Sequence, residues 1–259
     1  MSEHSSETLR SAEGGPTRVA LVSDVHGNLP AFQAVVTDIR STGVDAIWNL
    51  GDLVGYGAQP DECVELARDV CDLCLIGNHD LVVINKLDVE DFSANAATAA
   101  LWTRDQITPE TREFLSSLSP KDESRGLKLY HASPRDPVWE YVLSVGLADA
   151  CIKTMPGRLG AVGHSHVALW FWRNDGGQTI GEQAGAGMEV DLSKGEWLLN
   201  PGGVGQPRDG DPRAAWVLLD FDRSTAHWKR VEYPIDEAAK AIEEAGLPRS
   251  LADRLYFGQ

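Results

Sequence analysis

Basic residues and long apolar runs are both scarce in this sequence. Its 259 residues include 23 lysines and arginines against 39 aspartates and glutamates, a formal net charge of −16 at pH 7. This balance opposes the counterion release that drives most nucleic-acid binding, so a nucleic-acid polymer is a poor candidate partner. No run approaches the roughly 18 apolar residues of a membrane span, so we expect no membrane partner.

Cysteines are also few: Cys63, Cys71, Cys74 and Cys151. They fall in apolar or helical stretches and no secretory signal precedes them, so we expect reduced thiols and a cytoplasmic protein. The pair Cys71 and Cys74 lacks a second cysteine pair and a suitably spaced histidine. Core packing is therefore favoured over a metal or redox site.

The rest of the composition is typical of a globular protein, with 42% hydrophobic and 24% charged residues. Residues 1–16 are rich in serine and glutamate and nearly lack apolar side chains, which predicts a disordered tail. We find no internal repeat and no linker beyond them, so residues 17–259 are expected to form a single domain. A homo-oligomer is left open.

The first half of the chain alternates short apolar runs with amphipathic stretches. This alternation predicts parallel strands joined by helical crossovers. Asn28 can cap the first helix and Gly43 can end it. The expected strands are 18–23, 45–50, 72–76, 127–130 and 159–162, and the expected helices are 29–42, 60–70, two within 92–118 and one within 145–153.

The second half has shorter runs separated by turn residues such as Asn174 to Gly177, which is typical of antiparallel strands. The expected strands are 167–173, 178–182, 188–192, 197–199, 214–221 and 226–233, followed by a helix over 236–245. Because no linker separates the halves, we expect the second sheet to pack on the first, with helices outside.

Side chains that can bind metal follow five of the expected strands. Parallel strands place their ligand sites at their carboxyl ends, where the loops converge. Five of the seven histidines lie there, whereas His4 and His227 do not. The strand-end residues are Asp24, His26, Asp52, Asn78, His79, His131, His164 and His166.

These ligand types constrain the metal. Imidazole, carboxylate and amide oxygen suit manganese, iron or zinc better than calcium or magnesium, and no thiolate lies near enough in sequence to suggest a structural zinc cage. Seven ligand candidates exceed the need of one ion. Two ions roughly 3.5–4 Å apart that share a bridging carboxylate would use them all, and such pairs hold phosphate oxygens in many enzymes.

The order of these motifs resembles a known family. Asp24-Val-His26, Gly51-Asp52, Gly77-Asn-His-Asp80, His131 and Gly163-His-Ser-His166 are similar to the signature of the calcineurin-like metallophosphoesterases. The late glycine-rich loop of residues 200–211 resembles the compact bacterial and archaeal phosphodiesterase branch. The resemblance implies an α/β fold, a four-layer αββα sandwich of two stacked mixed β-sheets flanked by helices.

The same resemblance implies roles for the strand-end residues. Asp24, His26 and His166 would hold one ion, Asn78, His131 and His164 would hold the other, and Asp52 would bridge them. The ions would be manganese or iron, with zinc as an alternative. A hydroxide between them would attack phosphorus.

Two residues beside the ligand Asn78 are the candidates for catalysis. His79 would protonate the departing oxygen or stabilise charge on the phosphoryl group, and Asp80 would orient His79.

Substrate contacts are predicted from residues near these motifs. Arg208 and Arg135 could each bind a phosphate oxygen, Tyr56 could stack on a base or sugar, and Asn78 could also contact the substrate. Among the tryptophans, Trp139 is the one candidate for a functional role.

The leading hypothesis is two-metal hydrolysis of a small phosphodiester or phosphomonoester. A diadenosine-polyphosphate hydrolase and a protein phosphatase are alternatives that resemble the same family. A noncatalytic binding scaffold with this fold is the alternative from another class, and the presence of His79 argues against it.

Overall fold

The computed structural model describes residues 15–259, so the tail predicted for residues 1–16 lies almost entirely outside the described part of the chain. Two six-stranded sheets form the centre, in the orders β3-β2-β1-β11-β12-β9 and β4-β5-β6-β10-β7-β8. The first sheet contains β1 (Arg18–Val22), β2 (Ala46–Asn49), β3 (Leu73–Cys74), β9 (Glu189–Asp191), β11 (Ala214–Asp220) and β12 (Thr225–Val231). The second contains β4 (Lys121–Asp122), β5 (Lys128–Tyr130), β6 (Leu159–Ala161), β7 (Ala168–Arg173), β8 (Thr179–Gln183) and β10 (Glu196–Pro201).

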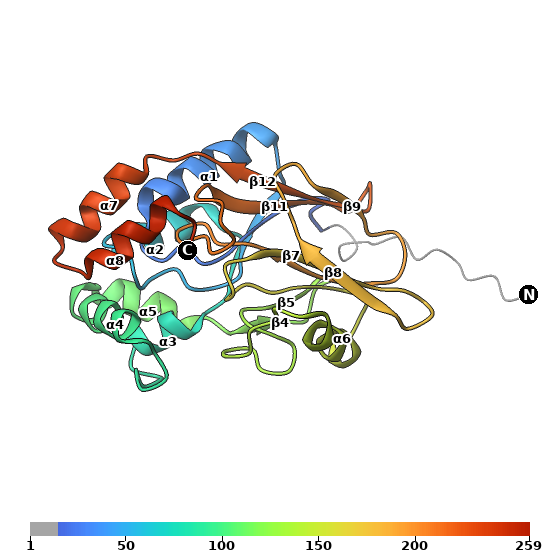
Figure 1. Ribbon diagram of the computed structural model, residues 1–259, viewed down its shortest axis with the longest axis horizontal. Helices are drawn as coiled ribbons and strands as arrows, with labels where there is room; N and C mark the ends of the chain where they lie inside the picture. Colours follow the sequence, from blue (N-terminus) through green and yellow to red (C-terminus); the bar gives the residue numbers. More distant parts are fainter. Residues whose placement is uncertain (1–14) are drawn as a thin grey trace, which may run out of the picture.

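Helices cover the outer faces of both sheets, and α6 lies apart from the others, against the second sheet (Figure 1). This arrangement confirms the four-layer α/β fold. The helices are α1 (Leu29–Thr42), α2 (Pro60–Val70), α3 (Asn78–Val83), α4 (Ala94–Gln106), α5 (Pro109–Ser117), α6 (Val145–Thr154), α7 (Ile235–Glu244) and α8 (Arg249–Asp253), with the 3-10 helix η1 (Arg254–Tyr256).

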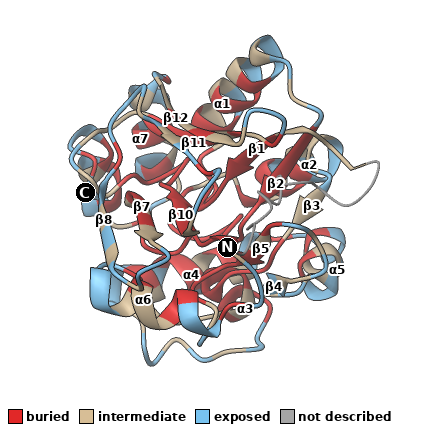
Figure 2. Cartoon of the chain, turned by 90° about the vertical axis from the view of Figure 1, so that its right-hand side faces the viewer, coloured by how far each residue is buried: buried red, intermediate tan, exposed pale blue. Residues whose placement is uncertain are grey.

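Three apolar clusters hold the layers together. One joins the first sheet to most of the helices, a second joins the inner faces of the two sheets, and a third joins α6 to the second sheet. Trp48 and Trp228, both at most 2% exposed, belong to the cluster between the sheets. Buried strands fill the centre while the helices expose one side, as Figure 2 shows.

The strand ladders differ from the simple division by halves. Each sheet takes strands from both halves of the chain: β11 pairs antiparallel with β1, and β10 pairs parallel with β6. The sequence could not show this pairing, because strands rich in β-branched residues occur in both halves and can pair with one another in either sheet. The consequence is that both sheets are mixed and both have parallel strands ending at the same side.

Local signals placed most helices correctly. The side chain of Asn28 accepts the N–H of Ala31 at the start of α1, and Gly43 ends α1 with a left-handed φ of 72°. The short helices α3 and α8 were not predicted, because segments of six and five residues are too short to show apolar periodicity. The four cysteines are free and pack in the apolar clusters, as expected.

Within residues 15–259, none of the helices has the length and apolar character needed to cross a membrane.

Candidate functional site

The carboxyl ends of five parallel strands meet at one side of the stacked sheets. β1, β2 and β3 run parallel in the first sheet, and β5 and β6 run parallel in the second. The N–H of His164 donates to Oδ2 of Asp24 at 3.1 Å and joins loops of the two sheets. The N–H of Gly163 donates to the carbonyl of His131 at 2.7 Å and joins the two loops of the second sheet. All the predicted strand-end residues are therefore brought together.

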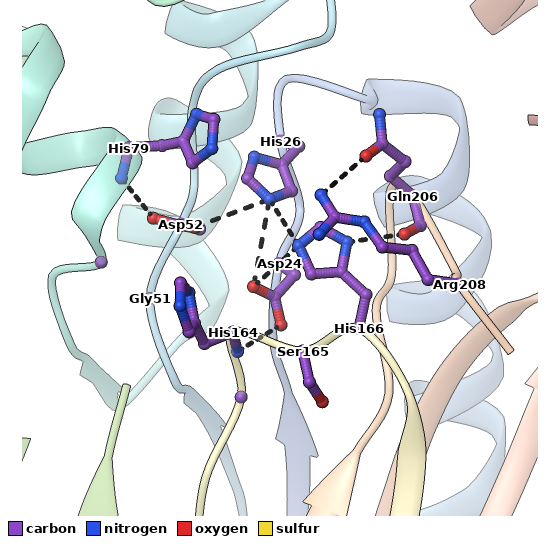
Figure 3. Close-up of polar contacts among 12 residues, drawn as sticks. Asp24, His26, Gly51, Asp52, His79, His164, Ser165, His166, Gln206 and Arg208 are labelled. Atoms are coloured by element: carbon purple, nitrogen blue, oxygen red, sulfur yellow. Dashed lines mark hydrogen bonds and ion pairs between the residues drawn. The ribbon is translucent and has the colours of Figure 1, made fainter. Parts of the chain in front are cut away.

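The first group of potential ligands consists of Asp24, His26 and His166. Their ligand atoms all lie within 4.8 Å of one another. Oδ1 of Asp24 is 3.4 Å from Nε2 of His166 and 3.9 Å from Nε2 of His26 (Figure 3). All three side chains are buried. This group has the size and composition of a site for a single ion.

A second group lies beside it and consists of Asp52, His131 and His164, with the same spread of ligand atoms. Oδ1 of Asn78 is 3.2 Å from Nε2 of His131, so the amide borders this group. Oδ2 of Asp52 lies between the groups, 3.5 Å from Nε2 of His131 and 3.6 Å from Nε2 of His26. One carboxylate oxygen thus faces both groups.

Main-chain carbonyls fix the orientation of the histidine rings. Nδ1 of His26, His131 and His166 donates to the carbonyls of Val54, Leu50 and Gln206, at 3.0, 2.8 and 2.6 Å. These contacts leave each Nε2 with its lone pair free to bind a cation. In His164 the ring is reversed, because Nε2 donates to the carbonyl of Trp139 at 3.2 Å and Nδ1 is left free. Such partners are typical of histidines that bind metal.

The backbone at these residues is strained. Asp24, His26, Asp52, His164 and His166 all have φ between 49° and 62°. Residues other than glycine rarely adopt this region of φ. The conformation costs free energy and persists only where the surrounding structure imposes it. Five such residues in one cluster indicate that the fold holds these loops in a strained conformation that orients their side chains toward one another.

The electrostatics of the cluster fit cations. Oδ1 of Asp24 and Oδ2 of Asp52 are buried and have no hydrogen-bond partner among the described residues. Burial raises the pKa of Asp24 to about 7 and raises that of Asp52 well above its usual value. Burial lowers the pKa of His164 to about 2, with His131 adding to the effect. Neutral imidazoles and buried carboxylate oxygens that lack a hydrogen-bond donor are the groups that a bound cation stabilises.

His79 and Asp80 follow Asn78 in α3 but face different partners. The ring of His79 packs between Tyr56 and Phe92, with centroids 4.4 Å from each, and its main-chain N–H donates to Oδ1 of Asp52 at 2.9 Å. Its Nδ1 is enclosed without a hydrogen-bond partner among the described residues.

Asp80 is placed differently from the expectation that it orients His79. Its carboxylate accepts the main-chain N–H groups of Asp52, Val54 and Gly77, at 2.9, 3.0 and 3.0 Å. Both oxygens are engaged by the backbone, so Asp80 orders the Asp52 loop. Because Asp80 follows His79 directly, the sequence suggested that the two side chains interact. The structure shows that main-chain N–H groups of the neighbouring loops bind the Asp80 carboxylate instead.

The predicted substrate contacts Arg208, Arg135 and Tyr56 have different surroundings. Arg208 lies beside the first group, where its main-chain N–H donates to the carbonyl of His166 at 3.1 Å. Arg135 instead pairs with Glu140 at 3.4 Å, and its side chain is 42% exposed. Tyr56 is 8% exposed and is enclosed by His79 and His26, so it has little free face to stack on a substrate. Tyr56 therefore packs among the histidines of the site, and Arg135 forms a partly exposed ion pair.

Three residues at the site were not predicted. Tyr141 stacks on His164 with centroids 4.0 Å apart and an interplanar angle of 20°. The carbonyl and side chain of Gln206 hold His166 and Arg208, respectively. Phe92 packs on His79, and its ring centroid lies 5.8 Å from that of Trp139, the tryptophan singled out from the sequence. No short motif marks these residues, because they come from irregular loops.

Two stacked mixed sheets with two Asp/His groups at their meeting strand ends define the metallophosphoesterase class. Residues 18–224 match the family model of the calcineurin-like phosphoesterase superfamily domain, and the chain belongs to this superfamily.

Similar proteins align with more than nine tenths of the chain. An uncharacterized protein of Methanocaldococcus jannaschii is 38% identical over 246 residues, which cover 93% of this chain and 98% of that protein. The crystal structure of a metallophosphoesterase from Sphaerobacter thermophilus is also 38% identical, with a TM-score of 0.86 over 95% of this chain and 100% of that one. A hypothetical protein from Pyrococcus horikoshii shares the fold at 18% identity, with a TM-score of 0.74 over 93% of this chain and 98% of that one.

Proposed function

We propose that this protein hydrolyses a small phosphodiester or phosphomonoester at a site for two divalent metal ions. The observation that carries the proposal is the position of Asp52, whose Oδ2 faces His26 of one group and His131 of the other at 3.6 and 3.5 Å. A shared carboxylate between two ligand sets is the arrangement that holds a pair of ions.

The residues present fit such a pair. Asp24, His26 and His166 would hold one ion, and His131, His164 and Asn78 would hold the other, with Asp52 common to both. Manganese or iron suits this mixture of imidazole, carboxylate and amide oxygen, and zinc is also compatible with it. When bound, two such ions supply a water of lowered pKa and neutralise charge on phosphate oxygens.

The side chains around the ligands provide the remaining chemistry. His79 is held against Phe92 and Tyr56 with Nδ1 enclosed, which leaves Nε2 to donate a proton to the departing oxygen. Arg208 binds a phosphate oxygen from the side of His166. The protein thereby positions the ester between a proton donor and a fixed positive charge.

The test combines metal analysis with turnover. Purified protein is stripped with a chelator, reloaded with Mn²⁺, and assayed with bis(p-nitrophenyl) phosphate and p-nitrophenyl phosphate. We expect about two ions per chain and recovery of p-nitrophenolate release with the metal. The ratio of the two rates then assigns the preference between diester and monoester.

The matched control replaces a bridging candidate and an exposed acid in parallel. Asp52→Asn removes a shared ligand, whereas Asp69→Asn removes a charge from the exposed face of α2. Loss of metal and turnover in the first variant alone supports the proposal. A fully metal-loaded protein that hydrolyses neither ester would refute it in favour of a binding scaffold.

A further inference from the structure

Three aromatic side chains connect the candidate acid with a candidate metal ligand. The ring centroid of Phe92 lies 4.4 Å from that of His79, and the ring of Tyr141 stacks on His164 with centroids 4.0 Å apart. Trp139 lies between these contacts, because its main-chain carbonyl accepts a hydrogen bond from Nε2 of His164 and its ring centroid is 5.8 Å from that of Phe92. We call Phe92, Trp139 and Tyr141 the aromatic rim.

Packing of the core does not explain the aromatic rim. Within residues 15–259, Trp139 and Tyr141 belong to none of the three apolar clusters. Tyr141 is 44% exposed, and Trp139 and Phe92 are half-buried, so all three residues keep surface that solvent reaches. Large apolar rings gain free energy when they are covered, and adjacent exposed ones are typical of binding sites. A ligand that covers the rim would recover this free energy.

The loop that carries Trp139 and Tyr141 is anchored on both sides of the two rings. Before them, Oδ1 of Asp136 accepts the main-chain N–H of Trp139 at 3.1 Å. After them, Val142 is 2% exposed and packs in the cluster that joins α6 to the second sheet. The two rings are therefore presented from an ordered loop. Ordered rings bind a flat group at a low cost in side-chain entropy.

The aromatic rim borders the position of the group that leaves phosphorus. In the proposed function His79 protonates the departing oxygen, so the atoms attached to that oxygen lie close to the Phe92 ring that packs on His79. In the view of Figure 3, His79 and His164 lie on the left and Arg208 lies on the right. The phosphate would thus face Arg208 and the metal groups, while the organic group attached to it would meet the rim.

We propose that the aromatic rim binds a flat aromatic ring carried by the alcohol part of the phosphate ester, so that aryl or nucleoside esters are preferred to aliphatic ones. The proposal rests on the proposed function, because the metal groups would hold the phosphate. The rings of Phe92 and Trp139 are nearly perpendicular, with an interplanar angle of 78°. A flat ring can stack on one of them and meet the other with its edge. Both contacts favour aromatic rings, whereas a saturated ring of the same size provides apolar area alone.

Equilibrium binding of phosphonates tests the rim without depending on turnover. Their carbon–phosphorus bond is not a substrate for ester hydrolysis, so the ligands stay intact on manganese-loaded protein. The aryl arm compares phenylphosphonate with cyclohexylphosphonate. The nucleobase arm compares 9-(2-phosphonomethoxyethyl)adenine with ethoxymethylphosphonate, which lacks only the base. We expect the aromatic member of at least one pair to bind about three- to tenfold more tightly in calorimetric titration, and the arm with the larger preference assigns the aryl or nucleoside class.

Substitutions assign the preference to the rim. Trp139→Leu removes a ring and keeps the main-chain carbonyl that His164 contacts. Tyr141→Leu removes the stacked ring, whereas Tyr141→Phe keeps it. Tyr256→Leu is the control, because Tyr256 is also 44% exposed but its hydroxyl donates to Asp236 on α7.

The two rim variants that lose a ring, Trp139→Leu and Tyr141→Leu, should behave alike. We expect each to lose at least about threefold of the affinity for the aromatic phosphonate, with little change for its non-aromatic partner. Tyr141→Phe and Tyr256→Leu should bind both ligands as the wild type does. Manganese content, measured for every variant, should stay that of the wild type.

Two outcomes would overturn the rim. One is equal affinity of the wild-type protein for both members of each pair. The other is an equal loss for both members in Trp139→Leu and Tyr141→Leu, which would show that these rings support the metal group and not the substrate.

The failure of the rim and of the catalysis can be told apart. A protein that hydrolyses p-nitrophenyl esters without a preference for aromatic phosphonates refutes the rim alone. A protein that prefers aromatic phosphonates and hydrolyses no ester keeps the rim and refutes the catalysis.

Discussion

The carboxylate of Asp80 accepts the main-chain N–H of Asp52 at 2.9 Å, which fixes the loop that presents the Asp52 carboxylate to both Asp/His groups. The same side chain binds Val54 and Gly77 and is fully buried. Asp80→Ala leaves three buried N–H groups without an acceptor, so we expect a loss of about 2–4 kcal/mol in the free energy of unfolding. Metal affinity should fall about 10- to 100-fold, as for other residues that orient ligands.

Urea unfolding and metal titration measure both effects. Asp69→Ala, on the exposed side of α2, serves as the control. An Asp80→Ala protein with normal metal affinity would show that the Asp52 loop is ordered without this carboxylate.

The close approach of the Asp52 loop leaves no room for a side chain at Gly77. A Cβ there would lie 1.9 Å from Oδ1 of Asp52 and 2.6 Å from its main-chain nitrogen, whereas φ is −100°, which alanine adopts freely. Gly77→Ala therefore acts by steric displacement, and we expect it to cost about 1–3 kcal/mol of stability and to reduce metal content. Gly185→Ala, where a Cβ meets nothing within 4 Å, should change neither quantity. Thermal unfolding and metal analysis of the two proteins provide the comparison, and equal behaviour would contradict the steric explanation.

His79 is expected to affect rate more than metal binding. It follows the metal-ligand candidate Asn78, and its ring packs on Phe92 and Tyr56. His79→Ala should keep the metal content of the wild type while kcat falls about 10²- to 10⁴-fold, the range for loss of a general acid. The matched variant is His227→Ala, because His227 lies on β12, outside the strand-end cluster. Undiminished kcat in metal-loaded His79→Ala would exclude the acid role.

The two Asp/His groups were predictable from the sequence because their signal is local. Each ligand follows a short apolar run, and parallel strands bring such ends together whatever the rest of the fold. Asp24, Asp52 and His131 are examples whose positions follow from strand order alone. The layers of the fold followed from the same alternation, although the pairing of β1 with β11 did not.

The surroundings of the ligands were not predictable in the same way. Tyr141 and Gln206 contact His164 and His166 from irregular loops, and their approach depends on tertiary packing. The partners of Asp80 are set by close contacts between loops, so its adjacency to His79 in the sequence did not indicate that its carboxylate binds the Asp52 loop. Residue types and spacing indicate which residues are candidate metal ligands, whereas the orientation of their side chains depends on how the loops fold.

A buried ion pair supports the loop that carries Arg208. Arg230 and Asp209 are paired with 2% and 0% exposed side chains, and Oδ2 of Asp209 also accepts the N–H of Ala168 at 3.1 Å. Arg230→Ala leaves a buried carboxylate without its counterion, which should cost about 3–5 kcal/mol of stability. Arg223→Ala breaks an exposed pair instead, and we expect a change of at most about 1 kcal/mol. Urea denaturation measures the free energy of unfolding of both variants. Similar losses would show that the buried ion pair contributes no more to stability than the exposed one.

Metal loading should depend on pH through the buried carboxylates. In the metal-free protein, burial raises the pKa of Asp24 to about 7, so its proton competes with a cation below that pH. We expect the apparent Mn²⁺ affinity to rise between about pH 6 and about pH 8, by about tenfold per pH unit below 7 for each proton released.

The same pKa shift gives the sign for stability without metal. A carboxyl group that is protonated in the folded state but ionised in the unfolded state favours unfolding as pH rises from about 4 to about 7. The contribution of Asp24 to the stability of the metal-free protein should therefore fall over that range, and Mn²⁺ should offset this loss near pH 7. The lowered pKa of His164 contributes in the opposite direction, because its neutral ring in the folded state favours folding as pH rises to about 6.5. Calorimetric titration in two buffers of different ionisation enthalpy counts the protons released. Mn²⁺ binding with no proton release near pH 6.5 would mean that Asp24 is already ionised in the folded, metal-free protein.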